Sequence, residues 1–203
     1  MPRVALISDT HIPSRKETIP EWVVEAVEAA DYTIHAGDFD SDAAFERVRE
    51  IAGETLTACA GNTDPPTLGL PDVATLDVEG VRFVVTHGTG DPDTYKERVA
   101  GIAAEHGEGT VIGVSGHTHR VHDEVVDGVR LLNPGSATGA APALTTTMLV
   151  VDVEGDHIAV SRVEGCLHLS GRFLRDAGEQ QVWNCSRCPT SPRCVRATTS
   201  PRS

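Results

Sequence analysis

Apolar residues in the first third of the chain form short runs that alternate with longer segments of helical periodicity. The short runs predict buried strands, and they cover residues 4–8 (VALIS), 32–38 (YTIHAGD) and 54–62 (ETLTACAGN). Amphipathic helices are predicted between these runs, where apolar positions recur every three or four residues, at 20–30 and 41–51. A strand–helix–strand order favours parallel strands joined by right-handed crossovers.

Later in the chain the pattern changes to strict alternation of apolar and polar residues. Such alternation on both sides of a Gly-containing turn predicts β-hairpins at 74–88, 120–136 and 145–165. A further helix is predicted at 92–106 and a further strand at 110–117. Because early strands alternate with helices and later ones form hairpins, the sequence predicts an α/β fold of two facing mixed β-sheets flanked by helices.

Composition narrows the class of protein. The 203 residues suffice for one domain with a sizeable core. The absence of an apolar run near 18 residues, and of a signal-peptide pattern at the start, predicts a cytoplasmic protein without a membrane span. The net charge is −13, and only Lys16 and Lys96 among the 17 basic residues are lysines. This balance is typical of a halophilic cytosol, although an ordinary acidic protein would share it, and it disfavours binding to long nucleic acid.

The end of the chain differs from the rest in charge and periodicity. Residues 172–203 contain six arginines, two acids and three cysteines. We therefore predict one domain at 1–165 and a disordered basic tail, rich in Cys, Arg, Ser and Pro, at 166–203. The alternatives are a shifted reading frame, a recent extension, or a zinc-bearing tail that binds nucleic acid. The zinc ligands would be Cys185, Cys188 and Cys194, with Cys166 or His168 as the fourth.

Polar residues of metal-binding types follow the predicted strands. They come from separate segments, and they are Asp9, His11, Asp38, Asn62, His87, His117 and His119. Ligands of α/β sheets gather beyond the carboxyl ends of strands, so these side chains can converge on one place. Carboxylate, imidazole and amide groups without thiolate suit Mn²⁺, Fe²⁺, Zn²⁺ or Co²⁺. So many ligands exceed the need of one tetrahedral ion, and a shared carboxylate can bridge two ions about 3.5–4 Å apart.

Short motifs occur in a fixed order along the chain, each after an apolar run. They are DTH (9–11), GD (37–38), GN (61–62), THG (86–88), GHTH (116–119) and NPGS (133–136). In this order they resemble the calcineurin-like metallophosphoesterase superfamily, and within it the small YfcE-type phosphodiesterase branch, which is related to a retromer scaffold subunit. The resemblance covers residues 1–165 and implies a four-layer sandwich of two sheets and flanking helices.

The resemblance also implies a role for each residue at a strand end. One metal ion would be held by Asp9, His11 and His119, the other by Asn62, His87 and His117, with Asp38 as the bridge. Direct participants in catalysis would be Asp38, Asn62 and His117. The implied cofactors are two divalent ions, with Mn²⁺ expected first and Ni²⁺, Fe²⁺, Zn²⁺ or Co²⁺ as alternatives.

The implied activity is hydrolysis of a small phosphoester, foremost a phosphodiester, by a hydroxide that bridges the two ions. The alternative is a non-enzymatic metal-binding scaffold of the same fold that mediates protein–protein interaction. One departure bears on activity: many members of the superfamily have His directly after GN, and this chain has Thr63 there. Because proton donation to the leaving group contributes about 10²–10⁴-fold, we expect activated esters to react best.

Other polar residues near the motifs are candidates for supporting the metal ligands. Asp64 could orient Asn62 or an imidazole, and His35 could support the site or be a satisfied core histidine. Strand alternation predicts that His122 faces away from His119 and is no ligand. The remaining candidates are Asn133 and Ser136 as support for the site, and Arg15 and Lys16 as phosphate contacts or solvated loop charges.

Overall fold

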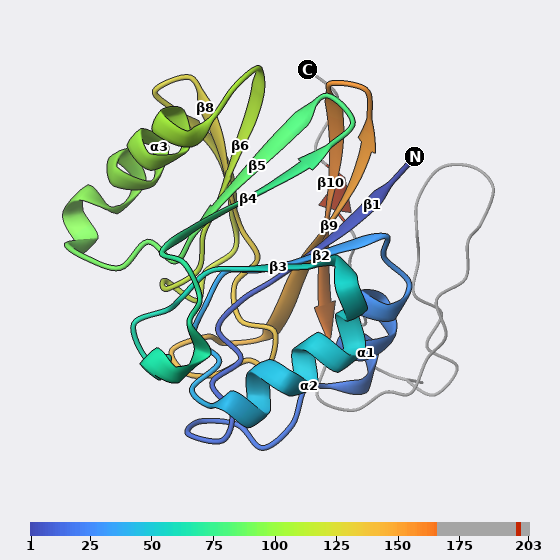
Figure 1. Cartoon of the computed structure of the whole chain (residues 1–203), viewed down its shortest axis with the longest axis vertical. Coiled ribbons are helices and arrows are strands. Elements are labelled where there is room, and N and C mark those ends of the chain that lie inside the picture. Colours follow the sequence, from blue (N-terminus) through green and yellow to red (C-terminus); the bar gives the residue numbers. More distant parts are fainter. Residues whose placement is uncertain (166–197, 200–203) are drawn as a thin grey trace.

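Two β-sheets pack face to face in the computed structural model, which describes residues 1–165 and 198–199 (Figure 1). The first sheet has the strand order β11-β10-β9-β1-β2-β3 and the second has the order β4-β5-β6-β8-β7. The strands of the first sheet are β1 (Arg3–Ile7), β2 (Tyr32–His35), β3 (Leu56–Ala58), β9 (Thr146–Glu154), β10 (His157–Gly165) and β11 (Thr198–Thr199). Those of the second are β4 (Val73–Val78), β5 (Val81–Thr86), β6 (Thr110–Val114), β7 (His122–Val126) and β8 (Val129–Asn133).

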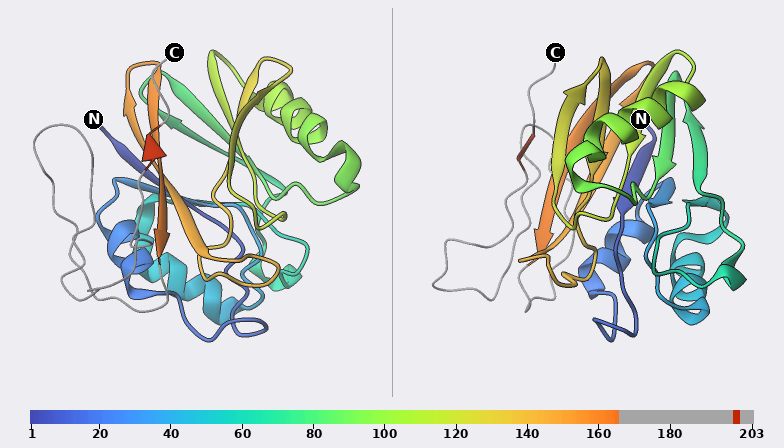
Figure 2. Two further views of the ribbon diagram at one scale, coloured as in Figure 1. Left: turned by 180° about the vertical axis from the view of Figure 1, so that it is seen from behind. Right: turned by 90° about the vertical axis from the view of Figure 1, so that its left-hand side faces the viewer.

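Helices cover the outer faces of both sheets. They are α1 (Glu21–Glu28), α2 (Asp42–Ala52) and α3 (Tyr95–His106), with short 3₁₀ turns η1 (Gly53–Thr55), η2 (Pro66–Leu68) and η3 (Pro92–Thr94). Figure 2 shows α1 and α2 on one side of the paired sheets and α3 on the other. Both sheets are mixed, because β1 runs parallel to β2 and antiparallel to β9, while β5 runs parallel to β6 and antiparallel to β4.

Apolar side chains fill three spaces between these layers. Along β1, Val4 and Leu6 enter the core between the sheets, whereas Ala5 and Ile7 pack toward α1 and α2. A strand that is buried on both faces needs such a continuous apolar run. Val99 of α3 and Leu131 of β8 belong to the third cluster, under α3. The predicted α/β sandwich of two mixed sheets with flanking helices is therefore confirmed.

The predicted strands extend too far at their carboxyl ends. β2 ends at His35 rather than Asp38, β3 ends at Ala58 rather than Asn62, and β6 ends at Val114 rather than His117. After β2, Gly37 has a φ of 86°, which turns the backbone out of the sheet. The polar residues that follow the strands consequently lie in tight loops, and these loops build the candidate site.

Most of the predicted tail lies outside the described residues, including the five candidate zinc ligands. β10 ends at Gly165, and the two residues of β11 pair antiparallel with Ser161 and Arg162 of β10. Disorder of the tail and a zinc site within it remain predictions. In the part of the chain that is described, no helix is both long and apolar enough to cross a membrane.

Candidate metal centre

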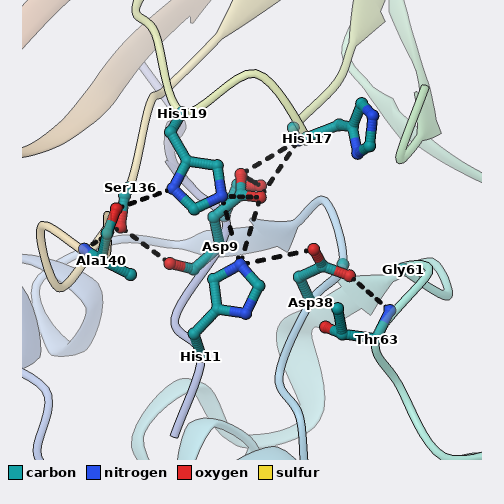
Figure 3. A network of polar contacts seen from close by, with 12 residues as sticks. Asp9, His11, Asp38, Gly61, Thr63, His117, His119, Ser136 and Ala140 are labelled. Carbon is teal, nitrogen blue, oxygen red and sulfur yellow. Dashed lines mark hydrogen bonds and ion pairs between the residues drawn. The ribbon is translucent and has the colours of Figure 1, made fainter. Parts of the chain in front are cut away.

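Four strand ends deliver the candidate ligands to one edge of the paired sheets. Asp9 and His11 follow β1, Asp38 follows β2, His87 follows β5, and His119 lies in the loop after β6. β1 and β2 are parallel, as are β5 and β6, so the carboxyl ends within each pair point the same way. Figure 3 shows Asp9, His11, Asp38 and His119 side by side.

Several candidate ligands have a backbone conformation in the left-handed region of φ/ψ space. The φ angles are 52° at Asp9, 47° at His11, 64° at Asp38, 67° at His117 and 56° at His119. For a residue other than Gly this conformation costs about 1–2 kcal/mol, and such strain clusters at functional sites. Cross-loop hydrogen bonds hold it: the N–H of Asp9 donates to Gly37 O and that of His11 donates to Asp38 O, each at 3.0 Å.

Three imidazoles at the site share one tautomer. Nδ1 of His87 donates to the carbonyl oxygen of Ala36 at 2.6 Å, and Nδ1 of His119 donates to that of Ala140 at 2.8 Å. Nδ1 of His11 lies 2.9 Å from a carboxylate oxygen of Asp40 and donates to it. Because these partners can only accept, the hydrogen of each ring in its neutral form lies on Nδ1, which leaves the Nε2 lone pair of that form free for a metal ion.

The Nε2 atoms face two buried carboxylates. Asp38 Oδ2 lies 3.4 Å from His11 Nε2 and 3.2 Å from His87 Nε2, and Asp9 Oδ1 lies 3.3 Å from His119 Nε2. Asp9, His11 and His119 each place a ligand atom within 4.8 Å of the others, and so do Asp9, Asp38 and His87. These are two adjoining ligand groups, with Asp9 shared by both and Asp38 in contact with histidines of both.

This donor arrangement fits divalent cations. The Nε2 atoms of His11 and His119 are 3.2 Å apart, and two lone pairs at that distance repel unless a cation lies between them. His87 Nε2 is buried and makes no hydrogen bond. Burial raises the pKa of Asp9 to about 7, against the lowering by His87 and Ser8. A bound cation would relieve each of these three penalties.

Asp38 is the carboxylate that the surroundings keep ionised. In the absence of a metal ion, burial raises the pKa of Asp38, but a protonated His87 beside it and the Thr63 N–H at 3.0 Å hold that pKa below its usual range. Asp38 is thus an ionised carboxylate ligand for a cation that enters the site.

Asn62 and His117 lie beside this cluster rather than inside it. Asn62 is exposed, and its Oδ1 accepts a hydrogen bond from the Thr89 hydroxyl at 3.4 Å. The His117 ring centroid is 5.1 Å from that of His87, and Figure 3 shows the ring turned away from Asp9. Five of the seven candidate ligands therefore converge in this conformation, and the roles expected of Asn62 and His117 stay predictions.

Two further carboxylates, those of Asp40 and Asp64, support the loops around the candidate ligands. Ser41 caps α2, whereas Asp40 accepts hydrogen bonds from His11 and from the hydroxyls of Ser14 and Thr63. Asp64 contacts neither Asn62 nor an imidazole. Its carboxylate accepts four backbone N–H groups, which belong to Asp38, Phe39, Asp40 and Gly61, at 2.6–3.0 Å.

Two histidines that were candidates lie outside the ligand groups. His35 is fully buried, its Nδ1 accepts from the Gly37 N–H at 3.2 Å, and its ring stacks on Phe39. Burial lowers the pKa of His35 to about 3, so it is a neutral core histidine that supports the loop before Asp38. His122 opens β7, whereas His119 lies in a loop, so strand alternation does not relate the two; His122 packs against Tyr95 instead.

The remaining candidates hold loops around the site. The Ser136 hydroxyl donates to the carbonyl oxygen of Asp9 at 2.8 Å. Asn133 is fully buried and donates to the carbonyl oxygen of Gly116 at 2.7 Å. Arg15 is exposed and donates to the carbonyl oxygen of Ala141 at 2.7 Å, which leaves a phosphate contact by Arg15 as a prediction.

Comparison with known proteins agrees with this geometry. The profile of the "Calcineurin-like phosphoesterase superfamily domain" matches residues 3–156. A "Probable metallophosphoesterase" of Methanothermobacter thermautotrophicus is 31% identical over 159 residues, which are 76% of this chain and 88% of that protein. A "Phosphodiesterase" of Methanocaldococcus jannaschii is 26% identical over 159 residues, which are 71% of this chain and 89% of that protein.

Solved structures with the same fold include several Vps29 proteins. Vps29 of Chaetomium thermophilum superposes with a TM-score of 0.69 at 18% identity and covers 99% of both chains. Vps29 of Entamoeba histolytica, crystallised in complex with Zn²⁺, superposes with a TM-score of 0.69 at 17% identity and covers 98% of both chains. At these identities the likeness concerns the fold alone.

Proposed function

Because the chain belongs to the calcineurin-like phosphoesterase superfamily, we propose that it is a phosphodiesterase that works with two divalent metal ions. The observation that carries the proposal is the orientation of three histidines, His11, His87 and His119. Each ring is fixed through Nδ1 and turns its Nε2 toward Asp9 or Asp38. Fixing a ligand histidine through its second nitrogen is the usual arrangement of a metal site.

The two ligand groups support a division of labour between two ions. Asp9, His11 and His119 would hold one, and His87 would hold the other, with Asn62 and His117 beside it and Asp38 between the two. The set has nitrogen and oxygen donors without thiolate, so Mn²⁺ is the cofactor we propose, and Ni²⁺, Fe²⁺, Zn²⁺ or Co²⁺ would also suit it. When bound, such ions supply Lewis acidity at the phosphate oxygens and an activated water.

In this proposal, the side chains of the protein position the metal ions and supply negative charge, and they do not transfer protons. Asp38 stays ionised, and the hydrogen bonds at Nδ1 hold the rings of His11, His87 and His119 in place. Thr63 stands where many relatives have His, and its hydroxyl donates to Asp40. No acid is therefore supplied there to the leaving group, so we propose that esters with stable leaving groups, such as nitrophenolate, react fastest.

Hydrolysis of bis-p-nitrophenyl phosphate tests the proposal. We expect turnover by the full chain with Mn²⁺, loss of turnover in EDTA, and recovery when Mn²⁺ is restored. Asp38→Ala should lower turnover by at least about 100-fold, since it removes the carboxylate between both groups. Asp72→Ala is the matched control, because Asp72 is exposed and its carboxylate contacts no candidate ligand among the described residues.

A non-enzymatic scaffold is the second candidate function, and the likeness to Vps29 folds is the observation that favours it. It predicts that the chain hydrolyses neither phosphodiesters nor phosphomonoesters with any of the five metals. Turnover that follows Mn²⁺ and disappears in Asp38→Ala would exclude this scaffold function as the sole role.

A further inference from the structure

A buried hydrogen-bond network lies under the loop that carries His117 and His119. Its centre is Tyr95, the first residue of α3, whose side chain is 5% exposed. The Tyr95 hydroxyl donates to the carbonyl oxygen of Gly116 at 2.9 Å. It also lies 2.8 Å from the Ser115 hydroxyl and accepts from Asn133 Nδ2 at 2.9 Å. A phenol can donate one hydrogen bond and accept two, so this hydroxyl makes all the hydrogen bonds available to it.

The network fixes the orientation of a single peptide group. Gly116 C=O and His117 N–H belong to that group, and in a trans peptide they point in opposite directions. Tyr95 and Asn133 hold the carbonyl oxygen, at 2.9 and 2.7 Å. The N–H is thereby aimed at the Asp9 carboxylate, with Oδ1 at 3.1 Å and Oδ2 at 3.2 Å (Figure 3). If this peptide flipped, a carbonyl oxygen would face a buried carboxylate.

Close packing surrounds this peptide, and the Thr118 N–H also donates to the Gly116 carbonyl oxygen at 2.7 Å. A Cβ on Gly116 would lie 2.0 Å from the Ser8 hydroxyl and 2.8 Å from Asp9 Oδ2. The Tyr95 ring also packs on Gly88, the residue after His87, where a Cβ would lie 2.6 Å from the ring. Tyr95 consequently touches the loops of both His87 and His117 without approaching a ligand atom itself.

We infer that Tyr95 is a positioning residue, which sets the Asp9 carboxylate for metal through the Gly116–His117 peptide. The inference rests on the proposed metal site and adds a residue to it. Groups that orient metal ligands contribute about 10–100-fold to metal affinity. Removing the Tyr95 hydroxyl should therefore weaken Mn²⁺ binding by about tenfold, because Asp9 keeps its Ser8 partner but loses a fixed N–H donor.

Tyr95→Phe tests the inference, with Tyr32→Phe and Ser115→Ala as controls. Tyr32→Phe removes the same phenolic oxygen at a partly buried position on β2. Ser115→Ala removes a partner of the phenol but leaves the bond to Gly116 intact. Calorimetric titration of metal-free full chain with Mn²⁺ gives the dissociation constant, and urea unfolding without metal gives stability separately. The Mn²⁺ concentration for half-maximal turnover is a third readout.

The inference predicts a dissociation constant raised about tenfold in Tyr95→Phe and changed less than about twofold in both controls. Turnover should recover most of its loss at saturating Mn²⁺. Wild-type affinity in Tyr95→Phe, with or without reduced stability, would overturn the inference and leave the proposed function standing. A wild-type chain that binds neither Mn²⁺ nor any of Ni²⁺, Fe²⁺, Zn²⁺ and Co²⁺ would overturn the proposed function and this inference together.

Discussion

Asp64→Asn should destabilise the loop that carries Asp38, because the Asp64 carboxylate gathers four backbone N–H groups. Oδ1 accepts from Phe39 at 2.6 Å and from Asp40 at 3.0 Å. Oδ2 accepts from Asp38 at 3.0 Å and from Gly61 at 2.7 Å. The substitution changes neither size nor shape, but it replaces one of the two acceptor oxygens with a donor.

Whichever oxygen is replaced, two backbone N–H groups lose their acceptor. A hydrogen bond to a charged group contributes about 1.5–3 kcal/mol, so two of them amount to about 3–6 kcal/mol. Asp64 is only partly buried, and water can reach some of the released N–H groups. We therefore expect the free energy of unfolding to fall by about 3 kcal/mol.

Urea unfolding of the metal-free full chain at pH 7 measures this change, followed by Mn²⁺ titration of the folded protein. Asp72→Asn is the matched control, since it makes the same replacement on an exposed side chain. A loss below about 0.5 kcal/mol in Asp64→Asn would refute the reasoning, because surface substitutions commonly change stability by that much.

Three further outcomes follow from the structure. Asp40→Asn removes the charged acceptor of His11 Nδ1–H and should weaken Mn²⁺ binding by about 10–100-fold; calorimetric affinity within about twofold of wild type would contradict this. Because a net charge of −13 is repulsive, the thermal midpoint should rise from about 0.1 to 2 M KCl, and a constant or falling midpoint would count against it. Burial raises the pKa of the Cys59 thiol, so iodoacetamide at pH 8 should label Cys59 in urea but not in the native protein; peptide mapping that finds equal labelling would disprove this.

The fold was readable from the sequence because the hydrophobic pattern follows burial closely. Along β1, Val4 through Ile7 are all buried, as a strand between two layers requires. The hairpin turn at Asp127–Gly128 has φ angles of 50° and 82°, which its residue types favour. The strand ends were harder to predict, since Ala36 continues the apolar pattern of β2 although the strand itself ends at His35.

Residue type and order alone singled out Asp9, His11, Asp38, His87 and His119, which the structure brings together. They could not indicate that Asn62 is exposed or that the His117 ring turns aside, because loop conformation decides both. The residues that support the ligands were still harder to predict from the sequence. Asp40 reaches His11 across 29 positions, and Tyr95 reaches Gly116 across 21, so no local pattern relates these partners.

The position of bound metal tests the central claim most directly. Crystals grown with Mn²⁺ would show it through anomalous scattering, which locates the ions without reference to activity. We predict two peaks about 3.5–4 Å apart, one beside Asp9, His11 and His119 and the other beside Asp38 and His87. A single peak away from these side chains, or no peak at a concentration that supports turnover, would contradict a two-metal site.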